Sequence, residues 1–223
     1  MQLKCRALAV ALAVVFLLFL SGLASAETQG WINNGVSLAV TRTVGFDFSW
    51  EGRYGSAVYY GTPFLRNLQI APVYKLPANA YLTVRYKREE VTQSSFISHE
   101  NRVTYEGGWK MRLAEDLAFD TRLRFESRNF EEETVQDHLR YRFRVRVTYK
   151  LRFQKLHIDP FIATEPFGDD KGSTEVFLNR NRFYLGAGIP VTEKVKLVAS
   201  YIRQDTRDKD TIHIMNMGIM FKL

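Results

Sequence analysis

The sequence predicts an all-β fold, a transmembrane antiparallel up-and-down β-barrel. Three observations lead to this prediction. Apolar and polar residues alternate along most of the chain, the connections between the alternating segments differ in length in a regular order, and the chain ends on a further alternating segment. A period of two places successive side chains on opposite faces of a strand. No segment after Ala26 shows a convincing helical period.

The first residues of the chain have the features of an export signal. Lys4 and Arg6 precede a wholly apolar run over residues 7–20, and Ala24 to Ala26 offer small residues at a cleavage site. A short basic region, an apolar region and an A-x-A site are typical of secretory signal peptides. The basic charge of the chain therefore does not indicate a cytosolic nucleic-acid binder.

We expect cleavage after Ala26, so that residues 1–26 are the signal peptide and residues 27–223 are the outer-membrane β-barrel. The alternative is an uncleaved anchor helix, because the uncharged stretch over residues 7–26 is just long enough to span a membrane. Cys5 is the one cysteine of the chain and would leave with the signal. The exported chain would then need neither a disulfide nor a thiol nucleophile.

The clearest alternation runs from His138 to Phe153. Its odd-numbered positions are all apolar, and its even-numbered positions are mostly arginine. Segments over Leu117–Ser127 and Val103–Arg112 repeat the pattern, and weaker versions occur elsewhere. We count eleven candidate strands, which start near Trp31, Val44, Phe64, Ala80, His99, Leu117, His138, Leu156, Asn179, Lys194 and Thr211.

The connections between these strands alternate in length. The short connections are residues 41–43, 77–79, 114–116, 154–155 and 192–193. The long connections are residues 55–63, 91–98, 129–137, 168–178 and 205–210. Transmembrane barrels have tight periplasmic turns at one end and longer outer loops at the other. A soluble meander has no reason to sort its loops in this way.

Alternation alone does not say which face points outward. In a soluble barrel the apolar face lines the interior, whereas in an outer-membrane barrel it faces lipid. Tyr141 and Phe143 precede the aliphatic Val145 and Val147, and Tyr149 follows them. Aromatic side chains at both ends of an apolar strand are typical of membrane interfaces. We therefore expect the apolar face to point outward.

The last residues resemble the C-terminal signal that barrel-assembly machinery reads. Gly218 precedes Ile219, Phe221 and Leu223, which are apolar residues at alternate final positions. We assign Gly218, Phe221 and Leu223 as an assembly signal, with the assembly machinery as a partner. Leu223 stands where bacterial barrels usually have an aromatic residue. The alternative is an ordinary amphipathic last strand.

Four blocks carry a family resemblance: Arg122–Arg128, Leu139–Arg144, Glu175–Phe177 and Asn181–Gly186. With these blocks the chain resembles a small bacterial outer-membrane β-barrel family catalogued as a domain of unknown function. It is similar in style, at a greater distance, to porins for acidic oligosaccharides whose walls carry arginine tracks. The resemblance implies location in the outer membrane and supplies no catalytic residue.

Eleven strands conflict with a closed, wholly antiparallel barrel, which needs an even number. Either the segment at Trp31 lies outside the sheet, which gives ten strands, or one strand remains to be found, which gives twelve. Asn33 to Gly35 is a possible tight turn that could split the first segment. We expect twelve strands, with ten as the alternative.

Over four consecutive strands, the polar face carries a surplus of bases. We expect this face to line the lumen and bind anions, because arginine suits bidentate contact with carboxylate, sulfate or phosphate. The candidate residues are Arg102, Arg112, Arg122, Arg124, Arg140, Arg142, Arg144 and Arg146. The sequence thus favours a narrow passive channel for anionic small solutes. The alternative is a closed structural or interaction barrel whose acids pair with these arginines.

A third possibility is surface lipid chemistry. His99 follows Ser94, Ser95 and Ser98, and His138 follows Asp137, at junctions between strands and long loops on the expected outer side. A serine beside a histidine in a polar loop is common by chance, so we predict no catalytic residue and no enzyme activity. No His, Asp or Glu cluster has metal-ligand spacing, and no motif points to a cofactor. The expected partners are outer-membrane lipid, lipopolysaccharide and acidic small solutes, and no nucleic acid.

Overall fold

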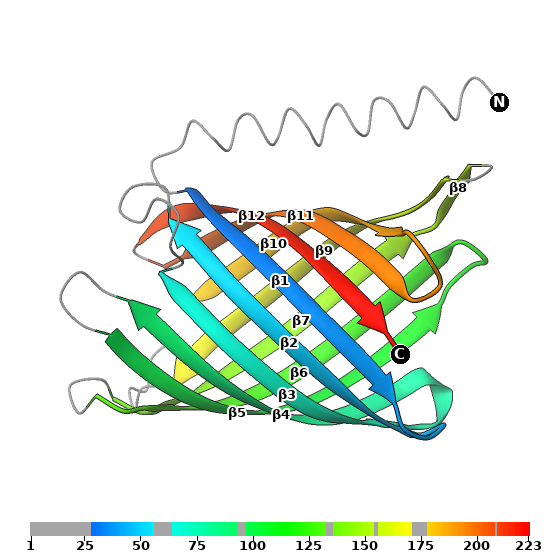
Figure 1. Cartoon of the computed structure of the whole chain (residues 1–223). Helices are drawn as coiled ribbons and strands as arrows, with labels where there is room; N and C mark the ends of the chain where they lie inside the picture. Colours follow the sequence, from blue (N-terminus) through cyan, green and yellow to red (C-terminus); the bar gives the residue numbers. More distant parts are fainter. Residues whose placement is uncertain are drawn as a thin grey trace.

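The computed structural model describes residues 28–55, 64–92, 97–132, 136–153, 156–170, 178–207 and 209–223. The expected signal peptide, residues 1–26, lies outside these ranges. The described residues form a β-barrel (Figure 1). Its strands are β1 (Thr28–Ala39), β2 (Val44–Gly55), β3 (Leu65–Lys75), β4 (Ala80–Thr92), β5 (Ile97–Arg112), β6 (Leu117–Phe130), β7 (His138–Tyr149), β8 (Leu151–Phe153), β9 (Leu156–Asp170), β10 (Arg180–Pro190), β11 (Val195–Thr206) and β12 (Lys209–Lys222).

One short 3-10 helix, η1 (Pro77–Asn79), connects β3 to β4. Within the described ranges, no helix is long and apolar enough to cross a membrane. The predicted all-β fold is confirmed, and strands begin at or close to each of the expected positions.

The barrel closes through a parallel pair. Consecutive strands of the ring pair antiparallel, but β1 pairs with β12 in parallel, from Thr28 opposite His213 to Ser37 opposite Lys222. The three-residue β8 continues β7 against β9 in the same register. The sheet therefore has twelve strands when β8 is counted, and eleven of them form the ring.

The expectation that an odd number of strands cannot close is therefore wrong. It assumed that every neighbouring pair is antiparallel, and a single parallel pair removes that restriction. Parallel strands also satisfy their backbone groups, through evenly spaced, slanted hydrogen bonds. The Trp31 segment lies within the sheet, as the unbroken strand β1. No turn splits it at Asn33 to Gly35, so neither of the two proposed ways to an even ring applies.

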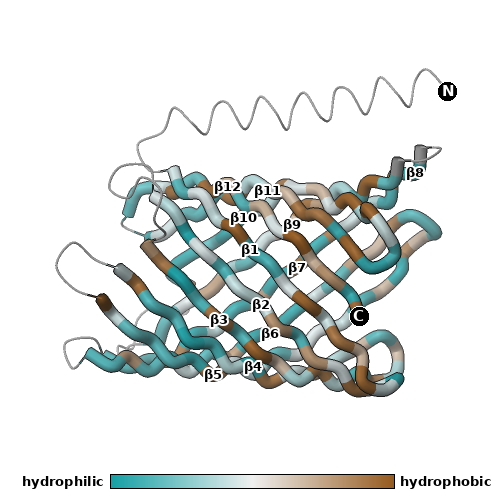
Figure 2. The backbone as a smooth tube through the Cα atoms, viewed as in Figure 1, coloured by the Kyte–Doolittle hydropathy of each residue, from teal (hydrophilic) through white to brown (hydrophobic). Residues whose placement is uncertain are grey.

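The apolar face points outward, as expected for a membrane barrel. On β7 the side chains of Leu139 and Phe143 are exposed, whereas Arg140 is only 7% exposed. Exposed apolar side chains occur on every strand from β1 to β7 and from β9 to β12. Figure 2 shows apolar and polar positions interleaved along the strands. The soluble alternative, with apolar residues lining the interior, does not describe this barrel.

Glycine permits close contact at the parallel seam. A Cβ atom on Gly218 of β12 would lie 2.2 Å from the backbone oxygen of Asn33 on β1. Beside it, the Asn33 side-chain amide donates to Asn216 Oδ1 at 2.5 Å. At the end of the seam, Leu223 N–H donates to the carbonyl of Ser37. Gly218 is thus required by the geometry of closure, whether or not the assembly machinery reads it.

We predict that Gly218→Ala destabilises the folded barrel by about 1–3 kcal/mol, the typical effect of overpacking a close contact. The added methyl group meets fixed backbone, which cannot move aside as a side chain can. Gly30→Ala is the matched control on the same seam, because its Cβ would have no neighbour nearer than 4.0 Å. Urea unfolding in detergent micelles measures the difference. Equal midpoints for the two variants would contradict the prediction.

Candidate functional site in the barrel interior

Charged side chains fill much of the interior, and Glu165 lies at their centre. Its side chain, on β9, is 0% exposed. It accepts hydrogen bonds from Arg122 Nη2 at 2.7 Å, Arg142 Nη2 at 2.6 Å and the Tyr184 hydroxyl at 2.7 Å. These three donors come from β6, β7 and β10. A carboxylate buried this deeply requires such partners, because an unpaired buried charge costs several kcal/mol.

A second arginine joins three carboxylates. Arg102 on β5 lies 2.6 Å from Glu100, 3.4 Å from Glu126 and 3.5 Å from Glu89. Glu89 also pairs with Lys87 on the same strand. Because Glu126 in turn contacts Arg142 at 3.1 Å, these pairs continue to Glu165. We call this connected set, together with the pairs around Asp169, the interior ion-pair network.

Near the long-loop end, Asp169 on β9 contacts basic side chains from two strands, β7 and β10. It lies 2.5 Å from Arg140 Nε, 3.5 Å from Arg180 Nη2 and 3.7 Å from His138 Nε2. Arg128 Nη1 lies 2.9 Å from His138 Nε2, and Arg128 also pairs with Glu100. The network therefore extends across β4, β5, β6, β7, β9 and β10.

All eight predicted lumen residues have the inward-facing register of their strands, and most are already paired. Arg102, Arg122, Arg140 and Arg142 belong to the interior ion-pair network. Arg124 pairs with Glu106, and Arg144 pairs with Asp120 at 3.0 Å. The remaining two have no carboxylate partner among the described residues. Arg146 lies 4.0 Å from the centre of the Phe161 ring, and Arg112 is exposed at the end of β5.

Glu165 and Asp169 were missed as counter-ions because the surplus of bases was counted on four strands that exclude β9. The inward positions of β9 include Phe161, Ala163 and Phe167 as well as the two acids. They show no clean alternation of charge that would mark an inner face. A lone glutamate within this mostly apolar stretch was the available signal.

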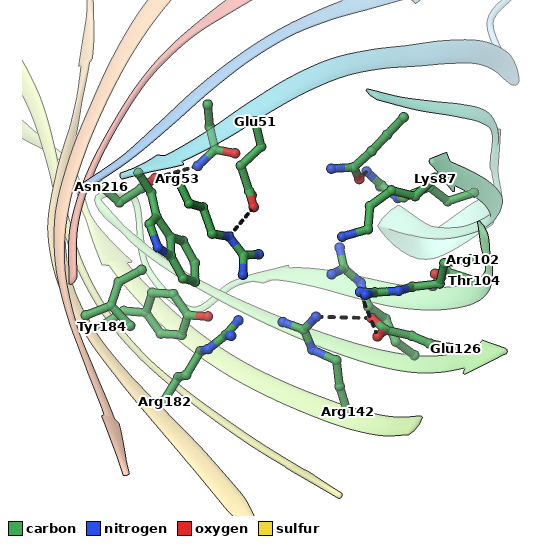
Figure 3. Close-up of a pocket in the computed structure, with 16 residues that line it drawn as sticks. Glu51, Arg53, Lys87, Arg102, Thr104, Glu126, Arg142, Arg182, Tyr184 and Asn216 are labelled. Atoms are coloured by element: carbon green, nitrogen blue, oxygen red, sulfur yellow. Dashed lines mark hydrogen bonds and ion pairs between the residues drawn. The ribbon is translucent and has the colours of Figure 1, made fainter. Parts of the chain in front are cut away.

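A cavity of about 170 Å³ remains beside the network (Figure 3). Seven cationic side chains and two carboxylates line it. The cations are Arg53, Arg85, Lys87, Arg102, Arg124, Arg142 and Arg182, and the acids are Glu51 and Glu126. Cations predominate at the surface of this central cavity because Glu89, Glu100, Glu106 and Glu165 do not line it, although every one of the seven cations except Arg182 has a carboxylate partner among the described residues.

The short-turn end of the interior is wider and rich in lysine. A cavity of about 600 Å³ at this end is lined by Lys75, Lys110, Lys194, Lys196 and Lys222, with Asp47 and Glu193 as its acids. A further cavity of about 470 Å³ shares Lys75 and Lys110 with it, and shares Arg85 with the central cavity. Neighbouring cavities thus lie between the short-turn mouth and the central cavity.

The structure does not bring Ser98 and His99 together. The Ser98 hydroxyl faces inward and donates to Glu132 at 2.8 Å, while His99 occupies the opposite face of β5. Slight desolvation raises the pKa of Glu132, but hydrogen bonds from the His99 backbone N–H and the Ser98 hydroxyl outweigh it and leave the pKa lowered. Ser94 and Ser95 lie outside the described residues. His138 contacts Arg128 and Asp169 rather than a serine.

Within the described ranges, no group of three or more His, Cys, Asp or Glu side chains could hold a metal ion. The predictions of no cofactor and no enzyme activity stay predictions.

The closed ring, the apolar outer face and the charged interior define an outer-membrane type of β-barrel. Two of the similar solved structures have TM-scores of at least 0.50 and share this fold. LpxR from Salmonella typhimurium is similar over 80% of this chain and 83% of its own, with 10% identity and a TM-score of 0.51. The β domain of the Bordetella autotransporter BrkA is similar over 79% of this chain and 82% of its own, with 12% identity and a TM-score of 0.50. The alignment with the NanC porin spans 88% of this chain and 99% of the porin chain, with 13% identity and a TM-score of 0.48.

Residues 28–214 match the family described as "Protein of unknown function (DUF2490)", and the chain belongs to this family. The resemblance to an outer-membrane family of unknown function is thereby confirmed. No curated protein sequence matches the chain significantly.

We predict that Glu165→Gln destabilises the barrel by about 3–5 kcal/mol, because it leaves Arg122 and Arg142 buried with less compensating charge. Asp205→Asn is the control. It removes an acid from an outer-face pair in which Arg203 and Asp205 have half-exposed side chains, and such pairs contribute at most about 1 kcal/mol. Urea unfolding monitored by the shift between folded and heat-unfolded gel mobility measures both. A Glu165→Gln midpoint equal to that of Asp205→Asn would refute a structural role for Glu165.

Proposed function

We propose that this protein is an outer-membrane barrel whose interior forms a narrow passage for small anionic solutes. The observation that supports the proposal is the central cavity, where seven cations face two carboxylates. Rings of arginine or lysine are a common means of anion selection in pores. Six of the seven cations pair with a carboxylate, which lowers the charge of the wall, and Arg182 alone has no such partner among the described residues.

The lysine-rich mouth supports the same proposal. Lys110 lies at the short-turn end, is exposed, and has no ion pair with a described acid. A cleft lined by one sign of charge concentrates ions of the opposite sign and speeds their entry. An anion that enters at this end would pass from lysines in solvent towards arginines in the narrower centre.

A second candidate function is a closed structural or interaction barrel. The specific observation that favours it is the pairing of Glu126 with Arg102 and Arg142, and of Arg142 with Glu165, which links β5, β6, β7 and β9. A fully salt-bridged interior would hold the ring together and conduct nothing. A lipid-modifying enzyme is a further alternative, and it requires a catalytic group that the described contacts of His99 and His138 do not supply.

We further propose that residues 1–26 direct export and that the mature chain lies in the bacterial outer membrane. Lipid and lipopolysaccharide would cover the apolar outer face. The assembly machinery would recognise Gly218, Phe221 and Leu223. In support, Phe221 and Leu223 expose apolar side chains at the free end of the last strand.

We predict an anion-selective conductance when the purified barrel is reconstituted in planar bilayers. Lys110→Glu should move the reversal potential in a salt gradient towards cation selectivity, because it reverses one charge at the mouth. Arg203→Glu makes the same change of charge on the outer face, where Arg203 is half-exposed, and should leave the reversal potential unchanged. Neither variant removes a buried partner.

Absence of conductance would favour the closed barrel. Equal reversal potentials for Lys110→Glu and the parent would remove the charge-selection argument. Arg142→Glu is a poorer probe, because Arg142 neutralises both Glu126 and Glu165 and its loss would disturb the fold.

We also predict that the protein made in bacteria separates with outer-membrane fractions and that its first residue is Glu27. N-terminal sequencing and membrane fractionation by density check the two statements. A protein that begins at Met1 would show that the segment is retained as an anchor. Recovery in the soluble periplasmic fraction would contradict the proposed location.

A further inference from the structure

Two arginines on either side of the parallel seam share one tryptophan ring. Trp31 lies on β1, and its side chain faces the interior with only 6% of the residue exposed. The guanidinium carbon of Arg53, on β2, lies 4.0 Å from the centre of a Trp31 ring, and that of Arg182, on β10, lies 5.0 Å from it. Cation–π contact therefore holds two positive groups close together, against their mutual repulsion.

Each of the two guanidinium groups is fixed through its Nε atom. Arg53 Nε donates to Glu51 Oε1 at 2.6 Å, and Arg182 Nε donates to Gln204 Oε1 at 2.7 Å. These bonds, together with the Trp31 ring, set the orientation of both side chains. Figure 3 shows Arg53 and Arg182 extending from the wall towards the middle of the central cavity.

The terminal Nη atoms of these arginines remain available. Among the described residues, Arg182 has no carboxylate within ion-pair distance, although it is only 8% exposed. The only ion pair of Arg53 in the described part of the chain is the one through Nε. This differs from Arg142, whose two Nη atoms bind Glu126 and Glu165. A buried guanidinium whose terminal N–H groups have no carboxylate partner suits an oxyanion, which it can bind through two parallel hydrogen bonds.

The size of the cavity limits the ligand. Its volume of about 170 Å³ is close to the ~150 Å³ of a protein cavity that accommodates benzene. A molecule with about one six-membered ring fits, whereas an oligosaccharide does not fit without movement of the wall. The surrounding cations exclude small cationic molecules.

We propose that Arg53 and Arg182 form a clamp, positioned by Trp31, that binds the carboxylate or phosphate group of a small molecule about the size of a single sugar ring. This inference rests on the proposed function, because it names the solute class and the point of recognition within the same lumen.

Tryptophan fluorescence tests the clamp without any measurement of transport. The chain has three tryptophans, and Trp50 and Trp109 lie on outward-facing positions of β2 and β5. The double replacement Trp50→Phe and Trp109→Phe leaves Trp31 as the one reporter in the folded, full-length barrel in detergent. Glucuronate and inorganic phosphate serve as probes, and glucose is the neutral control.

We expect glucuronate to change Trp31 emission in a saturable way, because the ligand draws the two guanidinium groups from the ring. If phosphate saturates at lower concentration, the clamp prefers phosphate groups; if glucuronate does, it prefers carboxylates; either response supports the clamp. Arg182→Gln should weaken binding by about tenfold or more, as loss of a charged hydrogen-bonding group predicts. Arg203→Gln on the outer face should bind like the parent.

Arg182→Lys keeps the charge but removes the planar guanidinium group and its paired donors. Its affinity for the anion should fall between those of the parent and Arg182→Gln. Heat-modifiable gel mobility shows that each variant is folded, and Arg182→Lys serves if Arg182→Gln does not fold. The clamp is refuted if neither anion gives a saturable response, if glucose matches them, or if both Arg182 variants bind like the parent. Saturable binding in a barrel that shows no conductance would refute the passage and keep the clamp. Anion conductance without a Trp31 response would refute the clamp and support the passage.

Discussion

The structure depends on the neutralisation of charge inside a narrow ring. Arginines from β6 and β7 reach carboxylates that lie on β9, and Glu165 receives hydrogen bonds from three strands at once. Because a buried ion pair gains little net stability over apolar packing, we infer that this network contributes more to the specificity of the fold than to its stability. It can be satisfied only when these strands stand in one order and one register. The interior charges therefore favour this one arrangement of strands, while the apolar outer face favours a lipid environment.

The interior is divided along the barrel axis. Towards the long loops, acids and bases pair closely around Glu100, Asp169 and Arg140. Towards the short turns, lysines line wider cavities with few acids beside them. A solute arriving from the two ends would meet different surroundings, solvated lysine on one side and paired arginine on the other. Under the proposed function, passage through the paired region would require local exchange of ion-pair partners.

Much of this fold could be predicted from the sequence. Alternation in segments such as His138–Tyr149 indicates that the segment is a strand and shows which residues lie on each of its faces. The alternation of short and long connections predicted an up-and-down barrel, and strands begin at or close to the eleven expected positions. The closure was not predictable in the same way. Pairing between the first and last strands leaves no local pattern, and the assumption of an antiparallel seam led away from the observed ring.

The candidate site was predicted only in part for a related reason. The arginine face of β7 was visible, whereas its neutralisation by Glu165 depends on a strand whose inner face mixes acids with Phe161 and Phe167. The clamp arginines, Arg53 and Arg182, lie far apart in sequence and meet on Trp31 only when the ring closes. Contacts across the seam cannot be obtained from patterns within single strands.

The parallel seam also decides on which side of the membrane each end of the barrel emerges. In a barrel with an even number of antiparallel strands, the first strand starts at the end where the last one finishes. Here β1 starts at the long-loop end, opposite the close of β2, and β12 finishes at the short-turn end. An epitope fused before Thr28 would therefore be displayed with the long loops, whereas one fused after Leu223 would remain with the short turns. If the barrel inserts into the outer membrane as proposed, with its long loops outside, insertion would also carry the segment before Thr28 to the far side, a translocation step that even-stranded barrels avoid.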